Sequence, residues 1–163
     1  EREKRYDCDG FRDVRKPRRA RITITPLTER GGVQVDTPSL MITDDDLDFR
    51  ETLRGVFEPR GFKTLVAGDG EEALEFVRTE EVHLLLLDMY MPRLSGLETI
   101  RRVKQSHELL PCILLSADMD QHLAAEARRA RAFSTLAKPV RFAEINSVVS
   151  RAMRSVYDWP PMG

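Results

Sequence analysis

Four consecutive leucines, residues 84–87, are the most constraining stretch of this chain because they stop abruptly at an acid, Asp88. A short apolar run bounded by turn residues is typical of a strand that is covered on both faces in a parallel sheet. An acid at the end of such a strand lies at the carboxyl edge of the sheet, where open α/β folds bind ligands. Asp88 is therefore either a reactive group at that edge or simply the cap of the next helix.

Four further strand-like runs alternate with helix-like stretches along the chain. These runs are expected at residues 39–43, 62–67, 112–116 and 133–137. The stretches between them carry apolar residues at helical spacing, for example over 119–132. Five alternations of strand and helix predict an α/β fold, in which a doubly wound parallel sheet is covered by helices on both faces.

The composition is that of an ordinary globular protein. The 163 residues are 41% hydrophobic and 33% charged with a formal net charge of −1, so one core can form and no strong field attracts nucleic acid or a membrane. No apolar run approaches the roughly 18 residues of a membrane span, and no signal peptide opens the sequence. Cys8 and Cys112 lack metal-ligand spacing, so we expect free thiols and a cytoplasmic location.

The amino-terminal segment differs from the rest in charge. Residues 1–39 hold ten Lys and Arg against seven Asp and Glu, a net charge of +3, whereas residues 40–163 carry a net charge of −4. We therefore expect residues 1–38 to form a basic, flexible extension with room for a short hairpin over 21–36. A solvated tail is the simpler interpretation, and an arm that binds nucleic acid or another acidic partner is the alternative.

Chemically reactive side chains stand at four of the five expected strand ends. They are Asp44, Asp45 and Asp46 after the first strand, Asp88 after the third, Ser116 at the fourth and Lys138 after the fifth. In a parallel sheet these ends share one edge, where clustered carboxylates need a cation or a proton to offset their repulsion. Oxygen ligands with room for water favour Mg²⁺, which also stabilises charge on a phosphoryl group in transit.

Each of these residues then has a role in phosphoryl transfer. Asp88 would be the nucleophile that forms an acyl phosphate. Lys138 would supply the opposing positive charge, and the hydroxyl of Ser116 would donate to a phosphoryl oxygen. The third acid, Asp46, is better explained as the N-cap of the helix that follows it.

Residues 39–156 strongly resemble the receiver domain of response regulators in two-component signalling. The resemblance rests on Asp44-Asp45, on Asp88-Met89-Tyr90-Met91-Pro92 with Ser95-Gly96, on Ser116-Ala117 and on Lys138-Pro139, in this order. It implies a flavodoxin-like domain of the chemotaxis-regulator type with strand order 2-1-3-4-5. Residues 157–163 are then a carboxy-terminal tail, in which Trp159 either packs back onto the domain or frays.

The resemblance also implies roles for the site residues. Asp88 would accept a phosphoryl group from a histidine kinase or a histidine phosphotransfer protein in the presence of Mg²⁺ or Mn²⁺. Asp45, Asp88 and the backbone carbonyl of Tyr90 would ligate the metal ion, and Asp44 would act through a water molecule. The domain would be a phospho-acceptor that signals, not an enzyme, with autocatalytic phosphotransfer and autodephosphorylation as its only reactions.

Two positions depart from the receiver pattern. Thr135 stands where receivers carry an aromatic residue that turns inward, so the usual readout of phosphorylation is not expected. Arg131 stands between two alanines where receivers usually carry a glycine, so we expect it to avoid the backbone conformations that only glycine adopts easily. Tyr90, Asp118 and Thr135 occupy positions that modulate the signal in the family, the first two through the lifetime of the acyl phosphate.

The expected function is phosphorylation-dependent protein binding, because few residues follow the last expected helix and leave no room for an output domain. The expected partners are the kinase or phosphotransfer protein and a downstream protein, and homodimer formation is left open. No membrane partner is expected, and nucleic acid is expected only through the amino-terminal arm. A dehalogenase-like phosphatase is disfavoured, because it would need a second acid two residues after Asp88, where this chain has Tyr90. A degenerate receiver that no longer takes phosphate is also disfavoured, because the acid pair, Asp88, Ser116 and Lys138 are all present.

Overall fold

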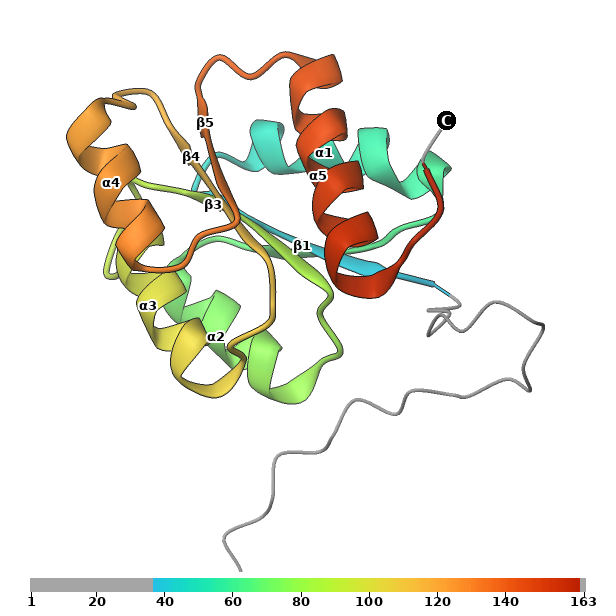
Figure 1. Ribbon diagram of the computed structural model, residues 1–163, viewed down its shortest axis with the longest axis horizontal. Coiled ribbons are helices and arrows are strands. Elements are labelled where there is room, and N and C mark those ends of the chain that lie inside the picture. The colour runs from blue at the N-terminus through green and yellow to red at the C-terminus, as the bar shows by residue number, and fades with distance from the viewer. Residues whose placement is uncertain (1–36, 162–163) are drawn as a thin grey trace, which may run out of the picture.

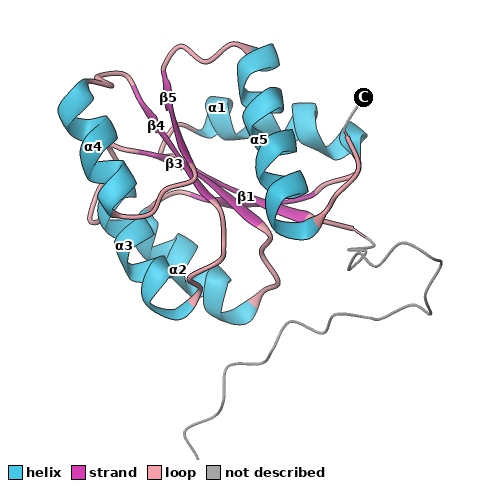
Figure 2. Ribbon diagram, in the orientation of Figure 1, coloured by secondary structure: helices cyan, strands magenta, loops and turns pink. Residues whose placement is uncertain are grey.

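The structure, a computed structural model, describes residues 37–161. Residues 1–36 of the extension expected over 1–38, which include the hairpin expected over 21–36 and Cys8, lie outside this range. Strands and helices alternate throughout the described part, as Figures 1 and 2 show. In chain order they are β1 (Ser39–Thr43), α1 (Leu47–Phe57), the short 3-10 helix η1 (Glu58–Arg60), β2 (Lys63–Ala67), α2 (Gly70–Thr79), β3 (Leu84–Asp88), α3 (Gly96–Ser106), β4 (Cys112–Ser116), α4 (Gln121–Arg129), β5 (Ser134–Ala137) and α5 (Phe142–Tyr157).

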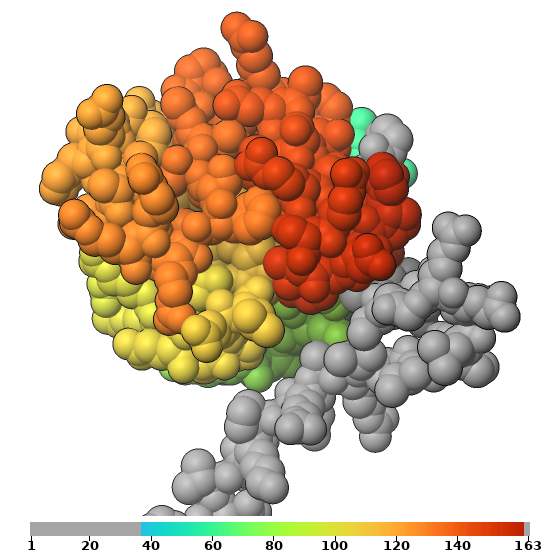
Figure 3. Space-filling view, viewed as in Figure 1, coloured from blue at the N-terminus to red at the C-terminus, as the bar shows by residue number. Residues whose placement is uncertain are grey.

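The five strands form one parallel sheet in the order β2-β1-β3-β4-β5. Helices α1 and α5 cover one face of the sheet, and α2, α3 and α4 cover the other (Figure 1). In the space-filling view, α4 and α5 lie at the surface turned toward the viewer (Figure 3). The doubly wound, flavodoxin-like fold with strand order 2-1-3-4-5 is thereby confirmed.

The leucine run is the central strand β3, which has hydrogen-bonded neighbours on both sides. Leu84 and Leu86 point into the apolar layer beneath α1 and α5, whereas Leu85 and Leu87 point into the layer beneath α2, α3 and α4. All four side chains are fully buried. A strand covered on both faces has no polar side, so its sequence is a continuous apolar run instead of an alternating one.

Helix α1 begins as expected, because the carboxylate of Asp46 accepts hydrogen bonds from the backbone N–H groups of Asp48 and Phe49. The predicted N-cap role of Asp46 is therefore confirmed. The helix ends at Phe57, and the chain then turns through η1 to Gly61, whose φ of 89° is left-handed. This turn connects α1 to β2.

The end of α4 corrects the expectation for Arg131. The helix covers Gln121–Arg129, shorter than the predicted 119–132, and Arg131 adopts a left-handed φ of 64°. The backbone N–H groups of Arg131 and Ala132 donate to the last carbonyls of the helix, each at 2.9 Å. This C-terminal hydrogen-bonding pattern needs a left-handed residue, so the arginine takes the conformation that a glycine would supply.

The carboxy-terminal helix α5 runs to Tyr157, and the backbone N–H of Trp159 donates to the carbonyl of Met153 at 3.3 Å. Trp159 also packs against the buried layer beneath α1 and α5. It therefore packs back onto the domain. Among residues 37–161, no helix combines the length and the apolar character that crossing a membrane requires.

Candidate functional site

Three acids from two neighbouring strands meet at the carboxyl edge of the sheet. Asp44 and Asp45 follow β1, Asp88 ends β3, and these two strands pair in parallel. One carboxylate oxygen from each of Asp44, Asp45 and Asp88 lies within 4.8 Å of the others. The structure thus brings together the three side chains for which the sequence predicted a shared site.

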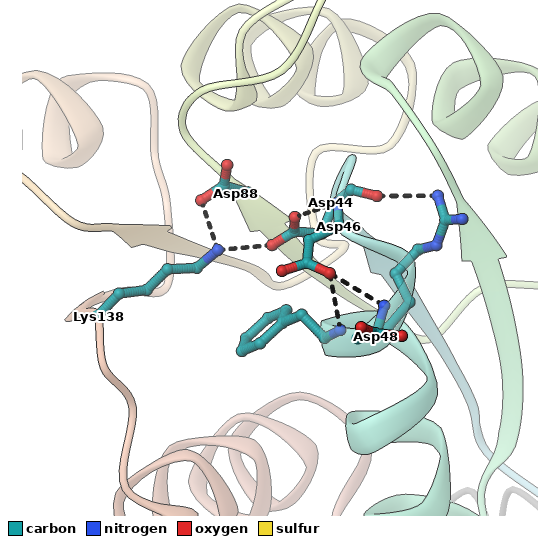
Figure 4. A network of polar contacts seen from close by, with 7 residues as sticks. Asp44, Asp46, Asp48, Asp88 and Lys138 are labelled. Carbon is teal, nitrogen blue, oxygen red and sulfur yellow. Dashed lines mark hydrogen bonds and ion pairs between the residues drawn. The ribbon is translucent and has the colours of Figure 1, made fainter.

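Lys138 reaches this cluster from β5, on the far side of β4. Its ammonium donates a hydrogen bond of 2.6 Å to Asp44 Oδ2 and lies 2.9 Å from Asp88 Oδ1. Figure 4 shows the extended lysine side chain ending between these two carboxylates. Lys138 is therefore placed where one positive charge offsets part of the negative charge of the cluster.

Burial and charge both act on the protonation of this cluster. Burial raises the pKa of Asp88, and the negative charges of Asp44 and Asp45 add to this effect, although the hydrogen bond from Lys138 opposes it. Burial alone would lower the pKa of Lys138, but its hydrogen bonds to Asp44 and Asp88 outweigh burial and raise the pKa. Lys138 therefore keeps its proton, and the cluster retains an excess of negative charge suited to a cation.

Ser116 ends β4 at the same edge, and its side chain is fully buried. The strand register pairs Asp88 with Leu115, so Ser116 extends one residue beyond the acid. Its hydroxyl accepts a hydrogen bond of 3.2 Å from the backbone N–H of Asp118. The hydroxyl proton therefore remains available for another acceptor at this edge.

The other predicted site residues lie around the cluster. Tyr90 follows β3 with a side chain that is 54% exposed, and Asp118 is exposed in the loop after β4. Thr135 lies half-buried within β5. Phe133 lies two residues before Thr135, just before β5 begins, where it packs against the core and lies under the guanidinium of Arg151.

Two further residues contact the site residues without having been predicted to do so, and a third holds a neighbouring loop. Arg50 donates a hydrogen bond of 2.9 Å to the backbone carbonyl of Asp44 and so holds the loop after β1. Phe49 lies with its ring 4.3 Å from the Lys138 ammonium. Arg93, in the loop after β3, pairs with the buried Asp69 that caps α2.

The sequence signal for these residues was incomplete. Phe49 stands in the apolar pattern of α1, which predicted only that it faces the core. The contact of Arg93 with Asp69 depends on how the loops after β3 and β2 approach one another, and sequence spacing does not encode that approach. Arg50 lies only six residues after Asp44, so its contact is local, but no pattern in the sequence marked it.

A doubly wound five-stranded sheet with three acids and a lysine at its carboxyl edge defines an α/β domain of flavodoxin-like fold with a charged site where such folds bind ligands. The chain belongs to the response regulator receiver domain family, which matches residues 40–150. It is thus a receiver domain of two-component systems.

Curated relatives support this assignment. The chain is 32% identical to sporulation initiation phosphotransferase F of Bacillus subtilis, over 69% of this chain and 90% of that protein. It is 30% identical to the transcriptional regulatory protein ZraR of Klebsiella oxytoca, over 75% of this chain, and 30% identical to the regulatory protein AtoC of Escherichia coli, over 71% of this chain. The matched regions span only 27% of ZraR and 25% of AtoC.

Solved structures agree with the fold. The receiver domain of a Francisella response regulator is 28% identical with a TM-score of 0.68, covering 73% of this chain and 99% of that one. The receiver domain of NtrX from Brucella abortus is 27% identical with a TM-score of 0.67, covering 71% and 98%. The Vibrio cholerae chemotaxis protein CheY4, at 20% identity and a TM-score of 0.68 over 71% and 98%, shares the fold.

Proposed function

We propose that Asp88 accepts a phosphoryl group from a histidine kinase or a histidine phosphotransfer protein in a Mg²⁺-dependent reaction. The observation that carries the proposal is the meeting of Asp44, Asp45 and Asp88 with the ammonium of Lys138 at one edge of the sheet. A carboxylate oxygen of Asp88 would attack phosphorus while the bond to the donor nitrogen breaks, and a donor ring that is protonated on its other nitrogen leaves as a neutral imidazole.

The donor set fits a hard divalent cation. Asp45, Asp88 and the backbone carbonyl of Tyr90 would hold the ion, with Asp44 acting through water, because carboxylate and carbonyl oxygens are the ligands that Mg²⁺ prefers. Three carboxylates face the single ammonium of Lys138, so the cluster has negative charge left for an ion. A bound Mg²⁺ supplies charge stabilisation for the phosphoryl oxygens.

Lys138 and Ser116 would stabilise the product. The ammonium of Lys138 already lies beside Asp88 Oδ1 and can donate to a phosphoryl oxygen after a short movement. Ser116 keeps its hydroxyl proton because the hydroxyl accepts, and does not donate, in its bond with Asp118. Both groups would then bind the phosphoryl group on the side of β4 and β5.

The same proposal includes how the domain signals to a downstream protein. Phosphorylation would change a surface that a downstream protein binds, with Tyr90, Asp118 and Thr135 modulating the lifetime or the readout of the phosphorylated form. We take residues 39–156 as the functional unit. The cytoplasmic location, homodimer formation and an amino-terminal arm for nucleic acid or another acidic partner stay predictions.

Incubation of the chain with Mg²⁺ and acetyl phosphate tests the proposal by intact mass. We expect the gain of one phosphoryl group, its loss in Asp88→Asn and its loss when a chelator removes Mg²⁺. Asp46→Asn is the matched control, because it removes a neighbouring acid outside the cluster while asparagine keeps the helix cap. No mass gain by the natural sequence, or an unchanged gain in Asp88→Asn, would refute the proposal.

A further inference from the structure

Lys138 has a third neighbour besides its two carboxylates. The ammonium donates a hydrogen bond to Asp44 and lies beside Asp88. It also lies over the ring of Phe49, 4.3 Å from the ring centre. The face of an aromatic ring carries partial negative charge and attracts an ammonium within about 6 Å. The lysine is thus held by two charged acceptors and one neutral one.

The ring of Phe49 is fixed from two sides. The backbone N–H of Phe49 donates to the Asp46 carboxylate at 3.3 Å, so the cap of α1 fixes the position of the Phe49 backbone. Its side chain packs against the buried layer beneath α1 and α5. A ring held by both the cap and the core is a rigid platform, whereas the lysine it contacts has a flexible four-carbon stem.

A neutral platform suits this position for an electrostatic reason. A further carboxylate would also attract Lys138, but it would add to the repulsion within the cluster and bind the divalent ion in competition with Asp45 and Asp88. An aromatic face orients the ammonium without adding a full charge or a metal ligand.

We propose that Phe49 is a positioning residue for Lys138, whose ring face holds the ammonium where it meets the phosphoryl group on Asp88. The expected effect of Phe49 on the rate of phosphoryl gain rests on the proposed function. The contact between Phe49 and Lys138 does not. The ring belongs to α1. Movement of Lys138 toward a phosphoryl group would therefore change the surroundings of an aromatic residue on that helix, in a chain where Thr135 takes the place of the usual aromatic in β5.

The contact can be measured without any phosphoryl transfer. An aromatic ring shifts the NMR signals of protons above its face upfield, so we expect the ε-methylene protons of Lys138 to resonate upfield in the natural sequence. In Phe49→Leu, which keeps apolar bulk but removes the ring, the upfield shift should disappear. An ordinary lysine chemical shift in the natural sequence would overturn the inference, whether or not the chain takes up phosphate.

The effect on rate is tested with fluorinated phenylalanines placed singly at position 49. Added fluorine progressively removes the negative charge of the ring face while nearly keeping its shape, so packing changes little. We expect the rate of phosphoryl gain from acetyl phosphate to fall stepwise, by about two- to fivefold across the series. The same analogues at Phe57, which is fully buried with its ring packed edge-on against Phe62, should leave the rate unchanged.

The outcomes separate the two proposals. A flat rate series at position 49, with normal phosphoryl gain, would overturn the role of Phe49 and leave the proposed function intact. No phosphoryl gain by the natural sequence would instead remove the proposed function, while the NMR shift would still decide whether the ring holds Lys138. The fluorinated series also keeps the test decisive if Phe49→Leu fails to fold.

Discussion

Lys138 donates a hydrogen bond of 2.6 Å to Asp44, a residue 94 positions earlier in the chain. The two residues come from β5 and from the loop after β1, which are separated in the sheet by β3 and β4. The carboxylate of Asp44 is almost fully buried, so its charge depends on this partner. The contact therefore joins the two halves of the sheet at the functional edge.

Removal of the lysine charge should destabilise the domain in a way that Mg²⁺ reverses. Within residues 37–161, Lys138 is the only cation that pairs with the clustered carboxylates, and Lys138→Gln removes it. We therefore expect the free energy of unfolding to fall by about 2 kcal/mol without metal. Added Mg²⁺ should restore most of this loss because it neutralises the same oxygens. Urea unfolding with and without Mg²⁺ measures both quantities.

The control for that prediction is Lys63→Gln. Lys63 forms an exposed ion pair with Glu80 at 3.5 Å, and such pairs contribute about 0–1 kcal/mol. Its loss should be small and independent of Mg²⁺. An equal loss for Lys138→Gln with and without the ion would contradict the proposed charge balance.

Gly96→Ala should disturb the acceptor through the backbone. A Cβ at Gly96 would overlap the backbone carbonyl oxygen of Asp88 and approach Leu114 Cδ1 to 2.8 Å. Because backbone cannot give way as a flexible side chain can, we expect a loss of about 2–3 kcal/mol in stability and a slower phosphoryl gain. Thermal unfolding and intact mass measure the two effects.

Gly55→Ala is the matched substitution. A Cβ there meets nothing within 4 Å, and Gly55 lies inside α1, so alanine should stabilise the domain by about 0.5–1 kcal/mol. If Gly96→Ala behaved like Gly55→Ala, the close approach to Asp88 would not constrain the site.

Acidification should weaken the domain through His83. This side chain is buried just before β3, and its Nδ1 accepts a hydrogen bond of 3.0 Å from the backbone N–H of Ser39. Burial lowers the pKa of His83 below its usual 6.5, although the carboxylate of Glu81 opposes this. The unfolded chain therefore binds a proton before the folded one does, and stability is lost as the pH falls from about 6.5 through the lowered pKa.

The measurement compares urea unfolding between pH 7.5 and pH 5 in the natural sequence, His83→Asn and His122→Asn. Asparagine keeps an acceptor for Ser39 but does not titrate, so His83→Asn should lose about 1 kcal/mol less over this range. His122 is exposed, and His122→Asn is the surface control for the loss of a histidine. A parallel pH dependence in all three proteins would show that His83 titrates normally.

Arg131→Gly should stabilise the domain. The left-handed φ of 64° strains any residue with a Cβ, and the ion pair that Arg131 forms with Glu108 at 2.5 Å is largely exposed and contributes little. We expect a gain of about 0.5–1 kcal/mol in thermal or urea unfolding. Arg128→Gly, inside α4, should instead lose about 1 kcal/mol. A loss in both variants would mean that the arginine contacts outweigh the strain.

The sequence by itself determined the alternation of strands and helices, the burial of the leucine strand and the residues at the strand ends. These features are local, because hydrophobic period, caps and turn residues act within a few positions of the chain. The parallel arrangement then requires that Asp44, Asp88, Ser116 and Lys138 share one edge, so the candidate site could be predicted as a group.

Only the tertiary structure decided how that edge is assembled in detail. The seating of Lys138 on the ring of Phe49 and the pairing of Arg93 with Asp69 both depend on distances between segments far apart in sequence. Such contacts are fixed when whole helices pack on the sheet, since a shift of one or two ångströms makes or breaks them. No periodic pattern in the sequence records those distances.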